Sequence, residues 1–341
     1  MKRIVLTPVI EGYADDFLKD LKALADKPED RLLDLINNLY GLPEGYADYI
    51  HAIRLHYDEI ITATSDEMNV PTGHVHSFFF AFGGLDLSIT HTISKLQPDG
   101  TTKQETKKFY QWVTDALGYD DVQEKLFPKY IKKMGIKSCV YCNAQYAISA
   151  KKWKTERGKA FRSTYTLDHY LPKSKYPYLA TSFFNLYPAC GSCNQSKSSR
   201  PPLFQLYVKT TDPVEQRNPF VFSLDKSSFV KYSMTGNADD LKIKFGTRSG
   251  ISEQKAIDYE NYFHVEKLYG NMNDTVEEVI WKSRVYNKAG RKALFESFGH
   301  LLPHKSDWNR FVLGNYDKEE DVMKRPLSKL LQDVAKQLDI I

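Results

Sequence analysis

Three short segments decide the fold of this chain: CVYC at 139–142, LDHYLPKS at 167–174 and NLYPACGSCNQSK at 185–197. They contain all the cysteines of the chain, which form two CxxC pairs: Cys139, Cys142, Cys190 and Cys193. A CxxC loop supplies two thiolates from one tight turn, and two such loops complete a tetrahedral Zn²⁺ site. Because no cysteine is left over, we expect one structural zinc ion rather than redox-active or unrelated cysteines.

The spacing between the two cysteine pairs is longer than in an ordinary zinc ribbon, since residues 143–189 separate them. An inserted loop or hairpin would explain this length. The entropic cost of closing a loop grows slowly with its length. A structural zinc ion contributes roughly 10–16 kcal/mol to folding, so the long gap does not argue against a shared site.

The composition bounds the class of protein. A chain of 341 residues with 42% hydrophobic and 26% charged residues is typical of a soluble globular protein with about two domains. The apolar stretch at 4–10 is short, contains Pro8 and is followed by acidic residues, so it does not resemble a signal peptide. The aromatic run at 78–82 is too short to span a membrane. We expect a cytoplasmic protein, where paired cysteines usually bind metal.

Positive charge is concentrated around the cysteines, although the net charge of the chain is only +4. Residues 131–200 carry 13 Lys or Arg against two acidic residues, an excess of +11, which leaves 34 basic and 41 acidic residues elsewhere. The 13 are Lys132, Lys133, Lys137, Lys151, Lys152, Lys154, Arg157, Lys159, Arg162, Lys173, Lys175, Lys197 and Arg200. Such a segment favours nucleic acid as a partner. A solvated charged face is the alternative interpretation.

The periodicity of apolar residues predicts a mainly helical α+β chain in three parts. We expect a helical region at 1–135, a zinc-stabilised core at 136–202, and a C-terminal region at 203–341. The C-terminal region should begin with a small antiparallel β segment near 220–246 and return to helix from about 253. Strands are predicted at 220–224, 229–232 and 241–245. An amphipathic helix is predicted in the tail, beginning near Pro326.

Within the core, the sequence predicts a compact strand–loop–strand–helix unit. The first strand covers 164–170 and carries Asp168 and His169, the second lies at 185–187, and the helix begins at Gly191 or Ser192. Adjacent side chains on a strand point to opposite faces, so Asp168 and His169 can serve one site only near a strand end. The start of the helix would bring Asn194 close to them and would favour a nearby phosphate.

Residues 139–199 resemble the HNH endonucleases of the ββα-metal superfamily. The resemblance covers about 60 residues, through CVYC, LDHYLPKS and NLYPACGSCNQSK in that order. At the third signature position this chain has Asn194 rather than histidine, a substitution that is common in the family. An amide oxygen is a hard ligand suited to Mg²⁺, so this substitution is chemically acceptable.

The resemblance implies a role for each matching residue in DNA hydrolysis. His169 would be the general base that activates water, and Asp168 and Asn194 would hold one catalytic Mg²⁺ or Mn²⁺. Asn185 would orient the loop after His169. The candidate phosphate contacts are Lys173, Lys197 and Arg200. Histidine titrates near neutral pH and can accept a proton from water, which agrees with the implied role.

The flanks also resemble the HNH nucleases of Septu-type antiphage defence systems, through the stretches HVEKLYGNMNDTVEEVI and FVLGNYDKEEDVMKRPLSKLLQDVAKQL. That resemblance implies an antiviral effector that works with an ATPase of the ABC or SMC-like type. The chain has no GxxxxGK[ST] motif, so ATP chemistry would come from the partner.

Two other functions were weighed against a nuclease. A catalytically inactive, zinc-stabilised module that binds nucleic acid or protein would not require the Asp168–His169 pair. A zinc deaminase needs His-x-Glu and Pro-Cys-x-x-Cys, but Leu171 occupies the Glu position and Ala189 separates Pro188 from Cys190. We therefore discard the deaminase and keep the inactive module as the alternative.

Overall fold

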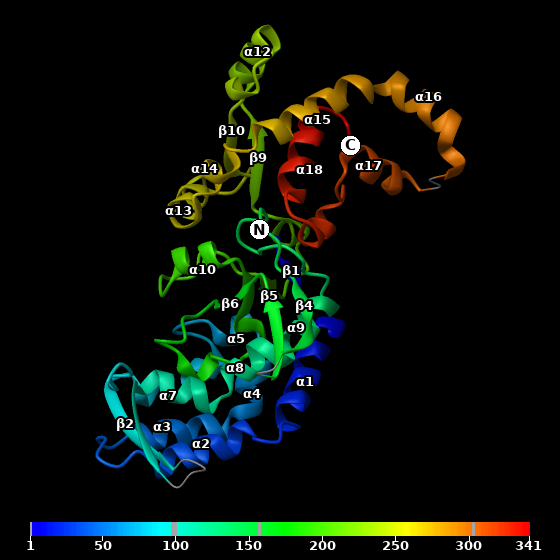
Figure 1. Cartoon of the computed structure of the whole chain (residues 1–341). Helices are drawn as coiled ribbons and strands as arrows, with labels where there is room; N and C mark the ends of the chain where they lie inside the picture. Colours follow the sequence, from blue (N-terminus) through cyan, green and yellow to red (C-terminus); the bar gives the residue numbers. More distant parts are fainter. Residues whose placement is uncertain (1, 97–100, 156–157, 302–303) are drawn as a thin grey trace.

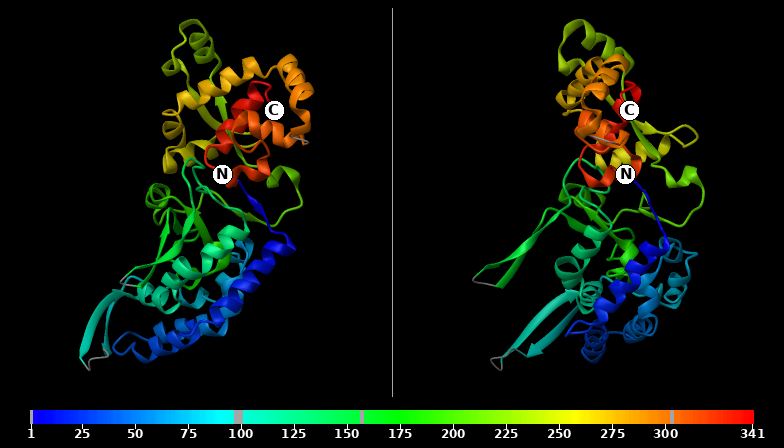
Figure 2. Two further views of the ribbon diagram at one scale, coloured as in Figure 1. Left: turned by 45° about the vertical axis from the view of Figure 1, so that its right-hand side comes forward. Right: turned by 90° about the vertical axis from the view of Figure 1, so that its right-hand side faces the viewer.

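The computed structural model describes residues 2–96, 101–155, 158–301 and 304–341. The chain is mainly helical with small two-stranded sheets, as the sequence predicted for the fold class. Figure 1 shows the N-terminal helices at one end of the molecule and the C-terminal helices at the other, with β6 and α10 between them. Figure 2 shows the same order of parts from two other directions.

Helices dominate the first part of the chain, as predicted. They are α1 Pro8–Lys22, α2 Pro28–Asn37, α3 Tyr46–Leu55, α4 Tyr57–Thr62, α5 Ser65–Met68, α6 His74–Ser77, α7 Phe109–Ala116, α8 Tyr119–Asp121 and α9 Phe127–Lys133. Helix α1 has a clear local cause: the Thr7 side chain caps it by accepting from Ile10 N, and Pro8 is its first residue. Its buried face, which includes Phe17 and Leu21, packs toward the core.

One element of this part was not predicted. Strands β2 Thr90–Leu96 and β3 Thr102–Lys108 form an antiparallel hairpin with Thr90 opposite Lys108. A second small sheet is formed by two strands that are far apart in the sequence: β1 Ile4–Val5 pairs in parallel with β8 Tyr207–Val208. The N-terminal segment therefore lies against the chain that leaves the core.

The core contains the predicted strand–strand–helix unit. Strand β6 Thr166–His169 pairs antiparallel with β7 Leu186–Ala189, and helix α10 Gly191–Lys197 follows. The long gap between the cysteine pairs is occupied in part by a hairpin, β4 Ser149–Thr155 and β5 Gly158–Ser163. Of the predicted basic residues, Arg157 lies outside the described residues, and the side chains at 151–162 are not described either.

The C-terminal region begins with the predicted antiparallel sheet, formed by β9 Phe220–Leu224 and β10 Ile243–Thr247. The helices that follow the sheet are α13 Gln254–Phe263, α14 Val265–Tyr269, α15 Asn273–Val285, α16 Lys288–Phe298, α17 Lys305–Leu313 and α18 Ser328–Gln337. Helix α18 is the predicted tail helix, and it packs on β9: Asp333 accepts a hydrogen bond from Phe222 N. A short helix, α11 Pro213–Gln216, precedes the sheet.

The predicted strand at 229–232 is wrong, because these residues lie inside helix α12 Lys226–Thr235. The helix has a strong local cause at each end. The Asp225 carboxylate caps the first turn by accepting from Ser228 N, and Gly236 ends the helix with a left-handed φ of 69°. The short apolar run at 229–232 fits both the helical period and the strand period. The capping residues on either side of it favour the helix.

Aromatic side chains join the parts of the chain in one core. Phe183, in the loop before β7, contacts Phe17 of α1 and Phe127 and Tyr130 of α9, with ring centroids 5.3–5.4 Å apart. The C-terminal region also contacts the core: Tyr259 of α13 donates a hydrogen bond to the carbonyl of Tyr141. The predicted boundaries near 135 and 202 stay predictions, and contacts cross both of them.

Candidate metal centre and active site

The four cysteines come together at one buried point. Their Sγ atoms all lie within 4.8 Å of one another, and the sulfurs of Cys142 and Cys190 are 4.0 Å apart. No disulfide joins them. A tetrahedral Zn²⁺ with Zn–S distances of about 2.3 Å would place sulfurs ~3.8 Å apart. The donor set and its spacing can therefore hold a structural metal such as zinc, as the spacing of the cysteines predicted.

Backbone amides and a backbone carbonyl around the cysteines form hydrogen bonds that fix the two CxxC loops. Cys190 N donates to the sulfur of Cys139 at 3.3 Å, and Ala144 N donates to that of Cys142 at 3.4 Å. The hydroxyl of Tyr269 in α14 donates to the carbonyl of Cys142 at 2.8 Å. Hydrogen bonds to the ligands and their loops orient a metal site, and here a C-terminal helix supplies one of them.

Asn143 continues this support directly after the first cysteine pair. It is buried and adopts a left-handed φ of 56°, which asparagine tolerates better than most residues. Its Nδ2 donates to Ser138 Oγ and to the carbonyl of Val322, and its Oδ1 accepts from Lys329 N. The first CxxC loop is thus fastened to the segment that leads into α18.

Asp168 and His169 occupy the last two positions of strand β6, opposite Tyr187 and Leu186 of β7. Residues on a strand alternate between faces, yet both of these line one cavity of about 280 Å³. The strand ends at His169, which allows the two side chains to approach the same space. Both side chains are almost completely buried.

The carboxylate of Asp168 has two partners. The Tyr141 hydroxyl donates to its Oδ2 at 2.5 Å, and Lys197 Nζ lies 3.3 Å from the same oxygen. Burial raises the pKa of Asp168, while the charge of Lys197 and the Tyr141 hydroxyl act in the opposite direction. A buried carboxylate of this kind favours additional positive charge in its surroundings.

His169 is held in one orientation by the protein backbone. Its Nε2 lies 2.9 Å from the carbonyl oxygen of Ala180, which can only accept, so the proton is on Nε2. The Nδ1 atom then carries the free lone pair, and it has no hydrogen-bond partner among the described residues. Burial, and next the charge of Lys173, lower the pKa of His169 to about 3. The ring is therefore neutral near pH 7, which is the protonation state that a general base requires.

Asn185 closes the loop between His169 and β7. Its Oδ1 accepts from Leu171 N at 2.8 Å, and its Nδ2 donates to the carbonyls of Leu179 and Leu171 at 2.9 and 3.2 Å. This side chain is fully buried. Leu179 precedes Ala180, the residue whose carbonyl holds the His169 ring. Asn185 thus holds the loop after His169 at two points, Leu171 and Leu179.

Asn194 and Lys173 reach the same cavity from two other elements. Asn194 lies in the first turns of α10, and its Nδ2 donates to Thr166 Oγ1 at 2.9 Å. Its Oδ1 has no hydrogen-bond partner among the described residues. Lys173 Nζ lies 3.9 Å from the centre of the Tyr119 ring, in cation–π contact. The cavity therefore combines a carboxylate, an amide oxygen, an imidazole and an ammonium group.

The other two predicted phosphate contacts lie elsewhere. Lys197 is 1% exposed and donates to the carbonyl of His169 at 2.6 Å in addition to pairing with Asp168. Arg200 stacks on the Tyr262 ring at 3.8 Å and donates to the carbonyl of Ser196. Neither residue lines the cavity. A phosphate contact needs an accessible cation, so the buried position of Lys197 favours an internal role, whereas Arg200 is partly exposed outside the cavity.

Sequence reasoning missed Tyr141 as a site residue. It lies inside the CVYC segment, but Asp168 is 27 residues further along the chain, and no spacing rule relates them. A tyrosine between two cysteines is also a normal core residue. Only the folded position of the first CxxC loop beside β6 shows the contact.

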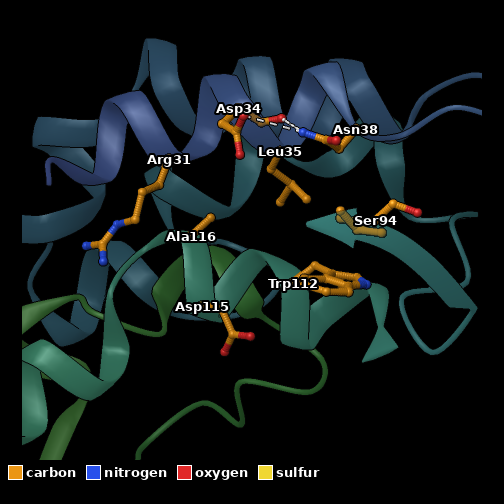
Figure 3. Close-up of a pocket in the computed structure, with 9 residues that line it drawn as sticks. Arg31, Asp34, Leu35, Asn38, Ser94, Trp112, Asp115 and Ala116 are labelled. Atoms are coloured by element: carbon orange, nitrogen blue, oxygen red, sulfur yellow. Dashed lines mark hydrogen bonds between the residues drawn. The ribbon is translucent and has the colours of Figure 1, made fainter. Parts of the chain in front are cut away.

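A larger cavity of about 410 Å³ lies among α2, α7 and β2, and it shares no residue with the site above. Figure 3 shows Asp34 and Asn38 joined by hydrogen bonds on its upper side and Trp112 of α7 on its lower side. Within the described ranges, the cysteine cluster is the only group of three or more His, Cys, Asp or Glu side chains that could hold a metal. The cavity in Figure 3 is lined by the carboxylates of Asp34 and Asp115 but by no histidine, so it lacks the imidazole of the Asp168–His169 site.

The low pKa of His169 has a consequence for stability. An unfolded histidine has a pKa of about 6.5, so as the pH falls the unfolded chain takes up a proton before the folded chain does. We expect the free energy of unfolding to fall by about 2 kcal/mol from pH 7 to pH 5 through this residue, and further until about pH 3. His169→Gln should remove this contribution while keeping an amide donor for Ala180.

The measurement is denaturant unfolding of both proteins at pH 7 and pH 5, without added divalent metal. Asp168 titrates in both proteins, so the difference between them isolates His169. An identical pH dependence in wild type and variant would show that the folded protein protonates His169 normally.

The whole chain was compared with protein-family models, with curated proteins and with solved structures, and none of the three comparisons gave a match. The resemblance to HNH nucleases therefore remains a prediction from three short segments. None of the helices in the described part of the chain combines the length and apolarity needed to cross a membrane.

Proposed function

We propose that this chain is a metal-dependent endonuclease of the HNH type that hydrolyses phosphodiester bonds in DNA. One observation carries the proposal: His169, with a free Nδ1 and a fixed tautomer, shares a small cavity with Asp168, Asn194 and Lys173. An imidazole held in this way can take a proton from an attacking water molecule. The excess of positive charge in residues 131–200 supports a polyanionic substrate.

The oxygen donors in the cavity fit a hard divalent cation. Asp168 is a buried carboxylate with a raised pKa, and Asn194 Oδ1 has no hydrogen-bond partner among the described residues. Carboxylate and amide oxygens are ligands that Mg²⁺ and Mn²⁺ accept. A bound ion would stabilise negative charge on the phosphate and on the departing 3′ oxygen. Asp168 and Asn194 are the residues that would hold it.

The remaining residues of the site would bind and orient the reactants. Lys173 is the phosphate contact that the geometry favours, because its ammonium group lines the cavity. Asn185 supports the loop whose Ala180 carbonyl accepts from Nε2 of His169, so Nε2 would keep its proton while Nδ1 takes up the proton from water. Lys197 neutralises Asp168 from the protein side.

The Asp168–Lys197 pair also favours a second function, a catalytically inactive module. Lys197 already supplies a counter-charge to the buried Asp168 carboxylate, so the charge of this site is balanced without an added cation. In such a module the cysteine cluster would stabilise a surface that binds nucleic acid or protein. The cleavage assay below separates the two functions.

The antiphage role and the ABC or SMC-like ATPase partner are further parts of this proposal. They are supported by the resemblance of the two C-terminal stretches to Septu-type proteins and by the helical regions that flank the core. A co-purification experiment with an ATPase encoded beside this chain would address them separately from the cleavage chemistry.

The proposed activity is tested with supercoiled plasmid DNA and the purified chain in Mg²⁺, in Mn²⁺ and in EDTA. We expect nicked and linear products with either metal and none with EDTA, because the reaction needs a cation at Asp168 and Asn194. The products should carry 5′-phosphate and 3′-hydroxyl ends. A folded protein that binds the plasmid but leaves it intact in both metals would support the inactive module instead.

A further inference from the structure

Tyr141 connects the cysteine cluster to the carboxylate of the candidate active site. It lies between Cys139 and Cys142, and its hydroxyl donates to Asp168 Oδ2 at 2.5 Å. Asp168 itself belongs to a different element, strand β6. The loop that supplies two of the four thiolates therefore also supplies a hydrogen bond to a residue that would hold the catalytic cation.

The position of the Tyr141 hydroxyl is fixed by packing. The side chain is 2% exposed, and its ring stacks on Phe263 of α13 at 4.6 Å with an angle of 17° between the planes. Its carbonyl accepts from the Tyr259 hydroxyl, and the neighbouring Val140 N donates to the carbonyl of Pro188 in β7. A side chain held from several directions has few alternative rotamers, so its hydroxyl is a rigid donor.

Asp168 is thus held from both cysteine loops. Tyr141 comes from the first loop, and Lys197 lies at the end of α10, the helix that begins directly after Cys190. The hydroxyl of Tyr141 engages Oδ2 and thereby limits rotation of the carboxylate. The restricted rotation determines how the other lone pairs of the Asp168 carboxylate are directed toward the cavity.

We infer that Tyr141 is a positioning residue that sets the orientation of the Asp168 carboxylate for a divalent cation. The loop that carries Cys139 and Cys142 thereby helps to set the geometry of the catalytic site. This inference rests on the proposed function. Partners that orient a metal ligand from outside the ligand shell change metal affinity by about 10–100-fold when they are removed. Tyr141→Phe removes the hydroxyl and keeps the stacked ring.

The test measures Mn²⁺ binding directly, from the loss of the electron paramagnetic resonance signal of free Mn²⁺, alongside plasmid cleavage. We expect Tyr141→Phe to weaken Mn²⁺ binding and to raise the metal concentration for half-maximal cleavage by about 10–100-fold. Cleavage at saturating metal should recover most of the wild-type rate. The zinc content should remain that of the wild type, because no thiolate is changed.

Tyr269→Phe is the matched control. It removes another buried hydroxyl that donates to the same loop, at the Cys142 carbonyl, but it does not contact Asp168. We expect normal Mn²⁺ binding from this variant. An equal loss of Mn²⁺ affinity in both variants would overturn the inference, because loosening of the loop alone would then explain it, and so would unchanged affinity in Tyr141→Phe. A wild-type protein that neither binds Mn²⁺ nor cuts DNA would instead reject the proposed function, and this inference with it.

Discussion

Replacing Cys190 with serine will remove the metal from this chain and with it most of the folding stability of the core. The sulfur of Cys190 lies within 4.8 Å of the other three cysteine sulfurs, and β7 and α10 meet at this residue. Structural zinc contributes roughly 10–16 kcal/mol, whereas a whole domain is stable by only about 5–15 kcal/mol. We expect one zinc ion per wild-type chain by elemental analysis, and far less zinc with a strongly lowered unfolding temperature in Cys190→Ser.

Ser192→Ala provides the control for this substitution. Ser192 lies in the same CxxC loop, between Cys190 and Cys193, but its side chain is exposed. It should keep the zinc ion and the unfolding temperature of the wild type. A wild-type protein that is folded without any bound metal would reject the zinc site, as would a Cys190→Ser variant with unchanged stability.

If the proposed function is right, replacing His169 with glutamine will strongly slow DNA cleavage without unfolding the protein at neutral pH. The substitution removes the lone pair at Nδ1, while the glutamine amide can still donate to the Ala180 carbonyl. A positioned general base contributes about 10²–10⁴-fold to a rate. We therefore expect the cleavage rate at saturating Mn²⁺ to fall by at least about 10²-fold. Binding of plasmid DNA should change little, because the lysine and arginine side chains around the site remain.

His51→Gln serves as the matched control for this loss. His51 lies on α3, is exposed and belongs to no part of the site. The control should cut at the wild-type rate. The circular dichroism spectrum and zinc content of His169→Gln should match those of the wild type, so that a lost rate reflects lost chemistry.

The sequence predicted the local geometry of the core because short-range signals determine it. The spacing of the cysteines, the apolar strand before Asp168 and the glycine after Cys190 placed the two strands and the helix within a few residues of their positions in the structure. The antiparallel sheet at 220–247 and the tail helix followed from apolar periodicity in the same way.

The features that the sequence did not predict depend on contacts between distant residues. Lys197 was expected to meet phosphate, but it is buried because Asp168, 29 residues earlier, supplies its counter-charge. Tyr141 has the same kind of dependence on Asp168. The β2–β3 hairpin was missed inside a region of helical periodicity, and the helix at 226–235 was read as a strand because a short apolar run fits both periods.

The most direct test of the central claim compares the rates of plasmid cleavage by the wild type and His169→Gln. The two proteins are purified separately by the same procedure and assayed at saturating Mn²⁺. If the cavity at Asp168 and His169 is the active site, the wild type will nick the plasmid and the variant will be slower by at least about 10²-fold. Equal rates for the two proteins would contradict the claim, because the cutting would then come from another site or from a contaminant.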